Sequence, residues 1–456
     1  MADRRFARFR LWFGLSGSRV RRRVKKAMEA TSGPLLLRCS VQNYDWGRFG
    51  EDSTVARLFE QNSGGEIELA RPYAELWMGT HESGPSFVVA PSETAGSLGP
   101  ETVTLKQWIT ANPGSLGEKV VEKWGNDLPF LFKVLSVAKA LSIQAHPDKE
   151  LARMLHKMRP NVYKDPNHKP EMAIALTEFK ALCGFVNIEE LKDVLISVPE
   201  IKDLVGSEEA RKFFITEELD VNSEAKMFLQ SIFTKLISSS KEAVSELVSK
   251  LKVRLDTESK IRTLTEKEQL ILLLEKQYQA DVGVVAAYFF NYVKLSPGEA
   301  LYIGPNEPHA YISGECIECM AASDNVVRAG LTPKYIDVQT LCSMLTYKQG
   351  FPEIIRGSPV NPYVSRYTPP FDEFEVDHCL LPPKESVVFS AIPGPSIFIV
   401  VVGEGKMQFS ATDDQDQKFM MGDVFFVPAK NEIRISAGVD GPTQLFRAGV
   451  NHRIFC

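Results

Sequence analysis

The hydrophobic pattern of this chain changes its period twice, and this change limits the folds that the chain can adopt. From Pro34 to about Phe185, short alternating apolar runs are interrupted by Gly and Pro, which is typical of β-structure. Between Ile188 and about Ala280 prolines nearly vanish, and apolar residues recur three or four positions apart, as in a helix. Beta-type runs resume at Gly283. The sequence therefore predicts a mainly β protein with a helical insertion, whose flanking β segments join in space.

A short internal repeat lies in the β-type part that follows the helical stretch. The run from Gly298 to Pro305 (GEALYIGP) is echoed from Gly422 to Pro428 (GDVFFVP), each with a turn glycine, an acidic residue, an apolar strand and a proline. This repeat resembles the strand-turn pattern of cupins, which are jelly-roll barrels able to hold a metal. His309 follows the first copy, whereas the second copy continues as Ala-Lys-Asn-Glu. We therefore expect the second barrel to be free of metal.

The composition excludes several classes of protein. At 456 residues the chain has room for two or three domains, and 44% hydrophobic with 24% charged residues is ordinary for a globular protein. The net charge of −5 offers no general basic field for nucleic acid. No apolar run approaches the ~20 residues that a membrane helix needs. Seven scattered cysteines argue against a disulfide framework and for a reducing compartment. We interpret Cys316 and Cys319 as structural residues of a strand.

The first 33 residues differ from the rest of the chain in their charge. Ten Arg and Lys residues stand there against Asp3 and Glu29. Such a composition is typical of an organellar transit peptide, but the segment lacks the serine richness of those peptides. We expect residues 1–33 to be a disordered basic extension of a cytoplasmic protein, and organellar targeting is the alternative.

Three separate segments carry residues that can bind a metal. In the expected strand from Leu141 to Pro147, Ser142, Gln144 and His146 share one face because side chains alternate along a strand. Glu171 and His309 lie in two other segments beside turn-forming prolines. Two imidazoles, a carboxylate and an amide would form a mixed nitrogen and oxygen site suited to zinc. The alternative is that these histidines are hydrogen-bonded core residues, since only the fold can bring the three segments together.

Longer motifs, together with the three ligand segments, carry a resemblance to a known family. They are Val41–Gly47 (VQNYDWG), Pro72–His81 (PYAELWMGTH), Leu128–Leu135 (LPFLFKVL) and Ser323–Lys334 (SDNVVRAGLTPK). In this order, and over about residues 36 to 350, the chain resembles the type I mannose-6-phosphate isomerases. The resemblance implies two cupin-type jelly-roll barrels and an inserted helical domain. The expected parts are residues 34–185 and 284–352 for the catalytic zinc barrel, 186–283 for the helical insertion, and 353–456 for the metal-free C-terminal barrel.

The resemblance also implies roles for individual residues. One zinc per chain would be held by Gln144, His146, Glu171 and His309, and these ligands would leave the ion a net charge near +1. Arg328 matches the active-site residue of the family, and its guanidinium can neutralise an oxyanion or grip a phosphate. Glu318 is our candidate for the base, with Lys169 as the alternative. We expect Trp46, Tyr311 and Asp324 to line the pocket and Lys133, Ser142 and Lys334 to contact phosphate, while His81 and His168 support the site or lie at the surface.

The expected reaction interconverts D-mannose 6-phosphate and D-fructose 6-phosphate by moving a proton between C2 and C1 through a cis-enediol(ate). It would supply mannose for GDP-mannose and glycan synthesis. We expect a monomer whose partner is the sugar phosphate, without nucleic acid or membrane. One alternative is a cupin Fe(II) oxygenase with two His and one carboxylate, against which Gln144 argues. Another is a non-enzymatic sugar-binding cupin, which would not need Arg328.

Overall fold

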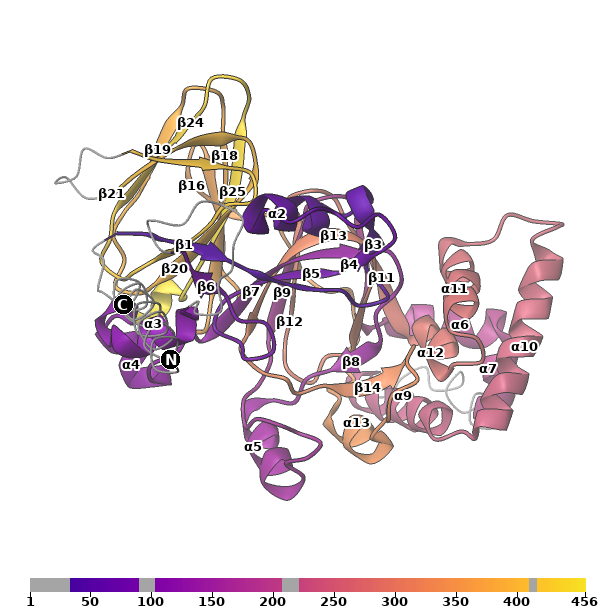
Figure 1. Cartoon of the computed structure of the whole chain (residues 1–456). Helices are drawn as coiled ribbons and strands as arrows, with labels where there is room; N and C mark the ends of the chain where they lie inside the picture. Colours follow the sequence, from indigo (N-terminus) through magenta and orange to yellow (C-terminus); the bar gives the residue numbers. More distant parts are fainter. Residues whose placement is uncertain (1–32, 90–102, 207–220, 410–415) are drawn as a thin grey trace, which may run out of the picture.

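The helical insertion lies where the hydrophobic period predicts it (Figure 1). Helices at 54–63, 105–111, 118–124 and 149–158 also interrupt the stretch predicted as β, so the protein is mixed α/β and not mainly β as expected. The computed structural model describes residues 33–89, 103–206, 221–409 and 416–456. Except for Gly33, the predicted basic extension lies outside the described residues. Extensive antiparallel sheets form the body of the protein, and a group of helices is inserted between two β-type stretches.

The largest sheet carries all three segments in which we expect metal ligands. Its eleven strands are β2 (Ser40–Gln42), β5 (Glu75–Met78), β7 (Phe130–Val137), β8 (Ile143–Ala145), β9 (Glu171–Ala175), β10 (Phe179–Phe185), β11 (Phe290–Leu295), β12 (Ala300–Ile303), β13 (His309–Ala321), β14 (Val327–Gly330) and β15 (Ile354–Ile355). The long strand β13 pairs with β7, β8, β9 and β10. It therefore links the expected ligand strands into one framework. The strands β3 (Arg48–Phe49) and β4 (Pro72–Tyr73) form a separate two-stranded sheet.

The C-terminal part of the chain forms an eight-stranded and a four-stranded sheet. The eight strands, in spatial order, are β16 (Ser358–Asn361), β17 (Val364–Tyr367), β18 (Glu375–Leu381), β25 (Thr443–Gly449), β20 (Ser396–Val402), β23 (Val424–Val427), β1 (Leu35–Arg38) and β6 (Phe87–Val88). The four strands are β19 (Ser386–Phe389), β24 (Ile433–Ala437), β21 (Glu404–Phe409) and β22 (Gln417–Met420). Strand β1 thus joins the C-terminal sheet from the other end of the described chain. Among the described residues, strand pairing in both large sheets follows open paths.

The inserted helices lie on the side of the large sheet that is remote from the C-terminal sheets (Figure 1). They are α6 (Ile188–Ser197), α7 (Pro199–Val205), α9 (Val221–Ile237), α10 (Lys241–Glu258), α11 (Glu266–Gln277) and α12 (Val282–Ala286). Local sequence sets their starts: Ser240 accepts a hydrogen bond from the Ala243 amide at the start of α10, and Thr265 forms a capping box with Glu268 in α11. The other helices are α2 (Thr54–Ser63), α3 (Leu105–Ala111), α4 (Glu118–Trp124), α5 (Lys149–Met158), α13 (Val338–Met344) and the 3-10 turns η1 (Gly50–Asp52), η2 (Pro113–Leu116), η3 (Ala287–Phe289) and η4 (His452–Ile454). Within the described ranges, every helix is too short or too polar to cross a membrane.

A continuous apolar core joins the inserted helices to β8 and β14. Ile143 and Ala145 of β8 and Ala329 of β14 are fully buried, and they belong to the same cluster as Phe233 of α9 and Leu274 of α11. The apolar face of β8 therefore packs toward the helices, as its alternation predicts, and burial of such side chains contributes roughly 1.5–3 kcal/mol each. Because Gln144 lies between Ile143 and Ala145, its side chain points the other way.

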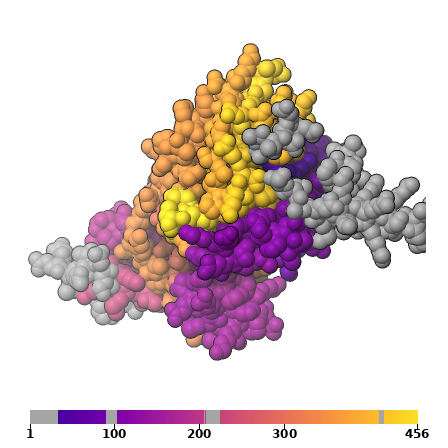
Figure 2. Space-filling view, turned by 90° about the vertical axis from the view of Figure 1, so that its left-hand side faces the viewer, coloured from indigo at the N-terminus to yellow at the C-terminus, as the bar shows by residue number. Residues whose placement is uncertain are grey.

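The C-terminal part also packs on the segment that contains α3 and α4 (Figure 2, where the C-terminal segments are orange to yellow and residues 103 to about 130 are purple). Trp108 of α3 meets Phe426 of β23 edge to face, with 5.9 Å between ring centroids. The Ala429 amide donates to the Ser115 carbonyl at 2.7 Å. Lys123 forms an ion pair with Asp372. These contacts fix the C-terminal sheets against the part that carries the ligand strands.

Candidate metal centre and active site

The register of three neighbouring strands places Gln144, His309 and Arg328 side by side. On β8, Gln144 lies opposite His309 of β13 on one side and opposite Arg328 of β14 on the other. Glu171 opens β9 and lies opposite Met320 of β13. The predicted ligands therefore stand on neighbouring strands of one sheet, and His146 follows directly after β8.

His146, Glu171 and His309 form a buried cluster. The Nε2 atom of His146 lies 3.4 Å from Glu171 Oε1, and the Nε2 atom of His309 lies 3.2 Å from Glu171 Oε2. The potential ligand atoms of the three residues all lie within 4.8 Å of one another. In the part of the chain that the structure describes, this is the cluster of His, Cys, Asp and Glu that could hold a metal ion.

Backbone carbonyls fix which nitrogen of each imidazole faces the cluster. His146 Nδ1 lies 2.7 Å from the Asn325 carbonyl, and His309 Nδ1 lies 3.1 Å from the Glu307 carbonyl. A carbonyl only accepts a hydrogen bond, so each Nδ1 must be the donor. In a neutral imidazole this leaves a lone pair on Nε2, which points toward Glu171 in both rings. This arrangement is typical of metal-binding histidines.

The protonation of the cluster also suits a cation. Burial lowers the pKa of His146 to about 4, so this ring is neutral at pH 7. Burial alone would raise the pKa of Glu171, but nearby positive charge, including the Lys169 ammonium 3.3 Å from Glu171 Oε1, holds this pKa well below its usual range. His146 Nε2 and Glu171 Oε2 are buried and make no hydrogen bond to any described residue. Two Nε2 atoms that face one carboxylate, with His146 Nε2 and Glu171 Oε2 lacking donors, fit a metal ion.

The side chain of Gln144 reaches the same point. Its amide nitrogen lies 3.5 Å from His309 Nε2. A half-turn of the amide would present the carbonyl oxygen there, and this oxygen is the atom that a hard or borderline cation prefers. All four residues predicted as zinc ligands are therefore brought together.

A cavity of about 840 Å³ opens beside the cluster. Both histidine rings are almost completely buried behind its wall, whereas Gln144 and Glu171 line it. The lining includes every other residue that we predicted for the site, namely Arg328, Glu318, Lys169, Trp46, Lys133, Ser142, Tyr311, Asp324 and Lys334. It also includes Tyr44, whose ring stacks on Trp46 with 5.8 Å between centroids. The cavity is large enough for a sugar phosphate.

One wall of the cavity holds a buried group of charges. Lys133 Nζ lies 3.0 Å from Glu318 Oε2 and 3.2 Å from Glu75 Oε2, and Trp77 Nε1 donates to Glu75 at 2.6 Å. Burial raises the pKa of Glu318, and the charges of Glu171 and Glu75 raise it further against the opposing effect of Lys133. Burial would lower the pKa of Lys133, but the two carboxylates outweigh it and raise this pKa. Lys133 is thus held by two carboxylates, and Glu318 binds a proton more readily than an exposed carboxylate does.

The lining of the cavity also presents cations. Arg328 and Lys334 form no ion pair with an acidic group among residues 33–89, 103–206, 221–409 and 416–456, although Arg328 is half-buried and its burial lowers its pKa. Lys169 also lines the cavity and pairs with Glu171. Asp324 lies 3.3 Å from His81 Nε2. The wall around Arg328 can therefore bind an anion.

Several supporting residues were not among the predicted site residues. Asp165 accepts hydrogen bonds from the Ser323 hydroxyl at 2.8 Å and from the Asp324 amide at 2.7 Å, and its backbone carbonyl accepts from the Asn325 amide group at 2.7 Å. This network fixes the Asn325 carbonyl that orients His146. Ser323–Asn325 lies in a quoted motif, but the sequence carries no indication that Asp165 contacts it.

Two further residues reach the site from distant parts of the chain. Glu373, which precedes β18, lies with Oε1 2.7 Å from Nε2 of His168, so the C-terminal part holds the segment that carries Lys169 and Glu171. Tyr278 follows α11 and lines the cavity.

Glu75 could have been found from sequence, because it alternates with Trp77 in a quoted motif and an acidic residue on a buried strand is unusual.

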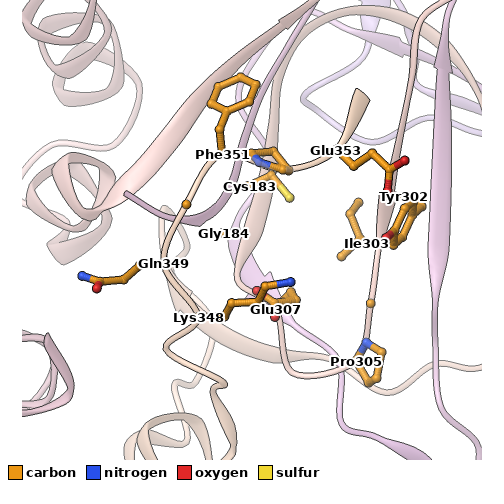
Figure 3. Close-up of a pocket in the computed structure, with 13 residues that line it drawn as sticks. Cys183, Gly184, Tyr302, Ile303, Pro305, Glu307, Lys348, Gln349, Phe351 and Glu353 are labelled. Atoms are coloured by element: carbon orange, nitrogen blue, oxygen red, sulfur yellow. The ribbon is translucent and has the colours of Figure 1, made fainter. Parts of the chain in front are cut away.

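A second cavity, of about 380 Å³, opens between β10 and β12, which do not pair with each other (Figure 3). Its lining includes Cys183, Tyr302, Glu307 and Lys348, and it contains none of the predicted site residues. Thr346 donates to Glu307 at 2.8 Å, and burial raises the pKa of Glu307. The predicted chemistry therefore belongs to the larger cavity.

Comparison with known proteins agrees with this geometry. Family models match three stretches: the phosphomannose isomerase type I catalytic domain at residues 35–188, its helical insertion domain at 204–290, and its C-terminal part at 367–411. Mannose-6-phosphate isomerase 1 of Arabidopsis thaliana is 58% identical over 91% of this chain and 94% of its own length. The Bos taurus mannose-6-phosphate isomerase is 43% identical over 90% of this chain and 97% of its own length.

Solved structures give the same result. A mannose 6-phosphate isomerase bound with zinc and yttrium has a TM-score of 0.75 and 29% identity, and it covers 92% of this chain and 100% of its own. The apo form from Salmonella typhimurium has a TM-score of 0.75 and 28% identity over the same shares. These matches show that the chain belongs to the type I phosphomannose isomerase family.

Proposed function

We propose that this chain is a zinc-dependent aldose–ketose isomerase that interconverts D-mannose 6-phosphate and D-fructose 6-phosphate through a cis-enediol(ate). The observation that carries the proposal is the convergence of two imidazole Nε2 atoms and a carboxylate at the edge of a cavity that Arg328 and Lys334 line. Two of the converging atoms, His146 Nε2 and Glu171 Oε2, have no hydrogen-bond donor among the described residues. Mannose-6-phosphate isomerases that are 41–58% identical over most of the chain support the reaction.

The proposed ligands of one zinc ion per chain are Gln144, His146, Glu171 and His309. When bound, zinc would act as a Lewis acid that stabilises negative charge as it develops on the substrate oxygens. The donor set suits this role, because neutral imidazoles and one carboxylate leave the ion positively charged, unlike a set of thiolates.

Glu318 is the proposed base that moves the proton between C2 and C1. Its carboxyl lines the cavity, and its raised pKa brings proton uptake and release closer to neutral pH, where an acid–base shuttle is most effective. Lys169 is the alternative, because it lines the cavity and its ammonium lies beside Glu171. The variants Glu318→Met and Lys169→Met distinguish the two candidates. Exchange of the substrate C2 proton with solvent should be lost only in the variant that lacks the base.

Arg328 is proposed to neutralise the enediolate or to grip the phosphate with two parallel donors. Lys334 adds a second cation at the mouth, with Ser142 and Lys133 as further polar contacts. Trp46, Tyr311 and Asp324 offer aromatic surface and hydrogen-bonding groups for the sugar. Burial and the charges of Glu318 and Glu171 keep the pKa of Tyr311 well above its usual value, so its hydroxyl stays protonated and can donate.

The proposed architecture is that of two cupin-type barrels. Residues 34–185 and 284–352 would form the zinc barrel, 186–283 the helical insertion and 353–456 a barrel without metal. We further propose that the protein acts as a cytoplasmic monomer and supplies mannose for GDP-mannose and glycan synthesis. Light scattering of the purified chain tests the monomer, and imaging of fusions with and without residues 1–33 tests the location.

Metal analysis combined with a coupled isomerase assay tests the function. We expect one zinc per chain, formation of fructose 6-phosphate from mannose 6-phosphate, loss of activity with a chelator and recovery on addition of zinc. Full activity after complete metal removal would reject the role of zinc. Absence of fructose 6-phosphate in the zinc-loaded protein would reject the reaction itself.

A further inference from the structure

The C-terminal end of the helical insertion contacts two of the loops that border the catalytic cavity. The Ala140 amide donates to Gln277 Oε1 at 3.0 Å, and the Tyr278 hydroxyl donates to the Ala140 carbonyl at 2.6 Å. Lys139, beside Ala140, lies over the Tyr278 ring with 4.4 Å to its centroid. Asp281 follows Tyr278 by three residues, and its carboxylate contacts the loop that follows β14.

The Asp281 carboxylate receives three backbone N–H groups. Its Oδ1 accepts from the Gly283 amide at 2.7 Å and from the Leu331 amide at 2.5 Å, and its Oδ2 accepts from the Thr332 amide at 3.1 Å. The first of these bonds caps the N-terminus of α12. The other two reach across 50 residues of sequence to the turn that follows β14. Asp281 therefore does more than end a helix.

The turn after β14 needs external support. Leu331 has φ +52°, a left-handed conformation that costs free energy for a side chain of this kind. The contact is also very close, since a Cβ on Gly283 would lie 2.4 Å from the Leu331 nitrogen and a Cβ on Gly330 would lie 2.4 Å from the Gly283 Cα. Two glycines and two charge-assisted hydrogen bonds thus keep this turn in one strained conformation.

This turn separates the two cations of the wall. Arg328 precedes Gly330 by two residues, and Lys334 ends the turn; Leu331, Thr332 and Pro333 between them all line the cavity. Among the described residues neither cation has an acidic partner that would fix its place. Arg328 is held by its ladder with β8, whereas the place of the Lys334 backbone relative to it depends on the turn, and the turn depends on Asp281.

We propose that Asp281 of the helical insertion is a positioning residue for substrate binding, which fixes the turn from Gly330 to Lys334 and thereby holds Lys334 beside Arg328 at the anion-binding wall. The proposal rests on the proposed function, because it takes the anion to be the phosphate or enediolate of the substrate. It gives the helical insertion a role in the reaction, although its helices supply no metal ligand. It also distinguishes Asp281 from an ordinary helix cap.

The test compares Asp281→Ala and Asp281→Asn with Ser240→Ala. Ser240 is the matched control, because it caps α10 of the same insertion and has no contact with the turn. Amide hydrogen exchange at Leu331 and Thr332, melting temperature, zinc content, KM and kcat are measured on zinc-loaded protein. Binding of fructose 6-phosphate is measured by calorimetry, so that a readout other than turnover is available.

We expect faster exchange at Leu331 and Thr332 in Asp281→Ala, unchanged zinc content, and KM and Kd raised by about tenfold or more, as expected when binding groups are displaced. Asp281→Asn has one acceptor oxygen instead of two and should lie between wild type and Asp281→Ala. Ser240→Ala should lower the melting temperature without changing KM. If Asp281→Ala does not fold, the Asn variant carries the test.

Two outcomes would overturn the proposal. If both Asp281 variants lower only the melting temperature, as Ser240→Ala does, Asp281 is a cap. If exchange at the turn increases while KM and Kd keep their wild-type values, the turn does not position the anion. Failure of the proposed function is a separate result, since wild-type protein would then neither turn over mannose 6-phosphate nor bind fructose 6-phosphate.

Discussion

Gln144 and Arg328 lie directly opposite each other on β8 and β14. The candidate ligand and the candidate anion-binding group are therefore built on one hydrogen-bonded ladder, whose other face packs against the inserted helices. A site on paired strands keeps its groups at fixed separation better than a site on loops. The distance between the metal centre and the guanidinium is thus set by the sheet.

The Arg328→Lys variant should lose turnover and keep its zinc. Lys retains the charge but lacks the planar pair of donors, and the loss of one positioned oxyanion donor costs about 3 kcal/mol, or roughly 10²-fold or more in rate. Zinc content, melting temperature and kcat are measured on one sample. Near-normal turnover would reject the catalytic role, and loss of zinc would mean that Arg328 supports the ligands.

The His146→Ala variant should lose metal and activity together. Glu171 and His309 would then lack the third strong ligand of the ion. His156→Ala is the matched control, because the Nδ1 atom of His156 also lies 2.7 Å from a backbone carbonyl, that of Tyr163, but this ring is outside the cluster. Metal analysis and the isomerase assay should separate the two variants, and a fully active, zinc-loaded His146→Ala protein would contradict the site.

The Lys133→Met variant should be strongly destabilised. It leaves Glu75 and Glu318 buried without their shared cation, and breaking a buried ion pair in this way typically costs about 3–5 kcal/mol. Lys123→Met is the control, because it removes an exposed pair with Asp372 that should contribute about 1 kcal/mol or less. Chemical denaturation compares the two, and equal stability losses would mean that Glu75 and Glu318 are accommodated as neutral acids.

The C-terminal sheets should bind no metal. The second copy of the repeat lacks a counterpart of His309, and the two histidines of this part, His378 and His452, lie on separate segments. Their replacement by Ala should leave the zinc content at one per chain. A second stoichiometric metal, or its loss in either variant, would show that the repeat was misinterpreted.

A protein that begins at Gly33 should fold and be active, because the basic segment lies outside every quoted motif. A protein that begins after Arg38 should neither fold nor be active, because it lacks β1, the strand between β23 and β6. Circular dichroism and the isomerase assay on both proteins check this. Loss of activity in the longer of the two would mean that residues 1–32 contribute to the enzyme.

The sequence predicts those features that depend on local periodicity. The alternation around Gln144 predicts the apolar and polar faces of β8. The recurrence of apolar residues every three or four positions predicts the inserted helices. The resemblance then identifies the four predicted ligands as ligands of one metal ion. By contrast, Asp165, Glu373 and Asp281 act through hydrogen bonds to residues far away in the sequence. Their contacts follow from tertiary packing, which no local pattern encodes, and the same holds for the partner strands of β1.

The place of β1 in the C-terminal sheet affects how the protein is made. Leu37 pairs with Val424, so during synthesis β1 waits until Val424 has been translated before this partner is available. Until then its apolar residues and unpaired edge are exposed to other chains. A truncated product that ends before β23 leaves this strand unpaired on that side, and it should be a substrate for chaperones and for quality-control proteases. Complete synthesis is therefore the step that closes the C-terminal sheet.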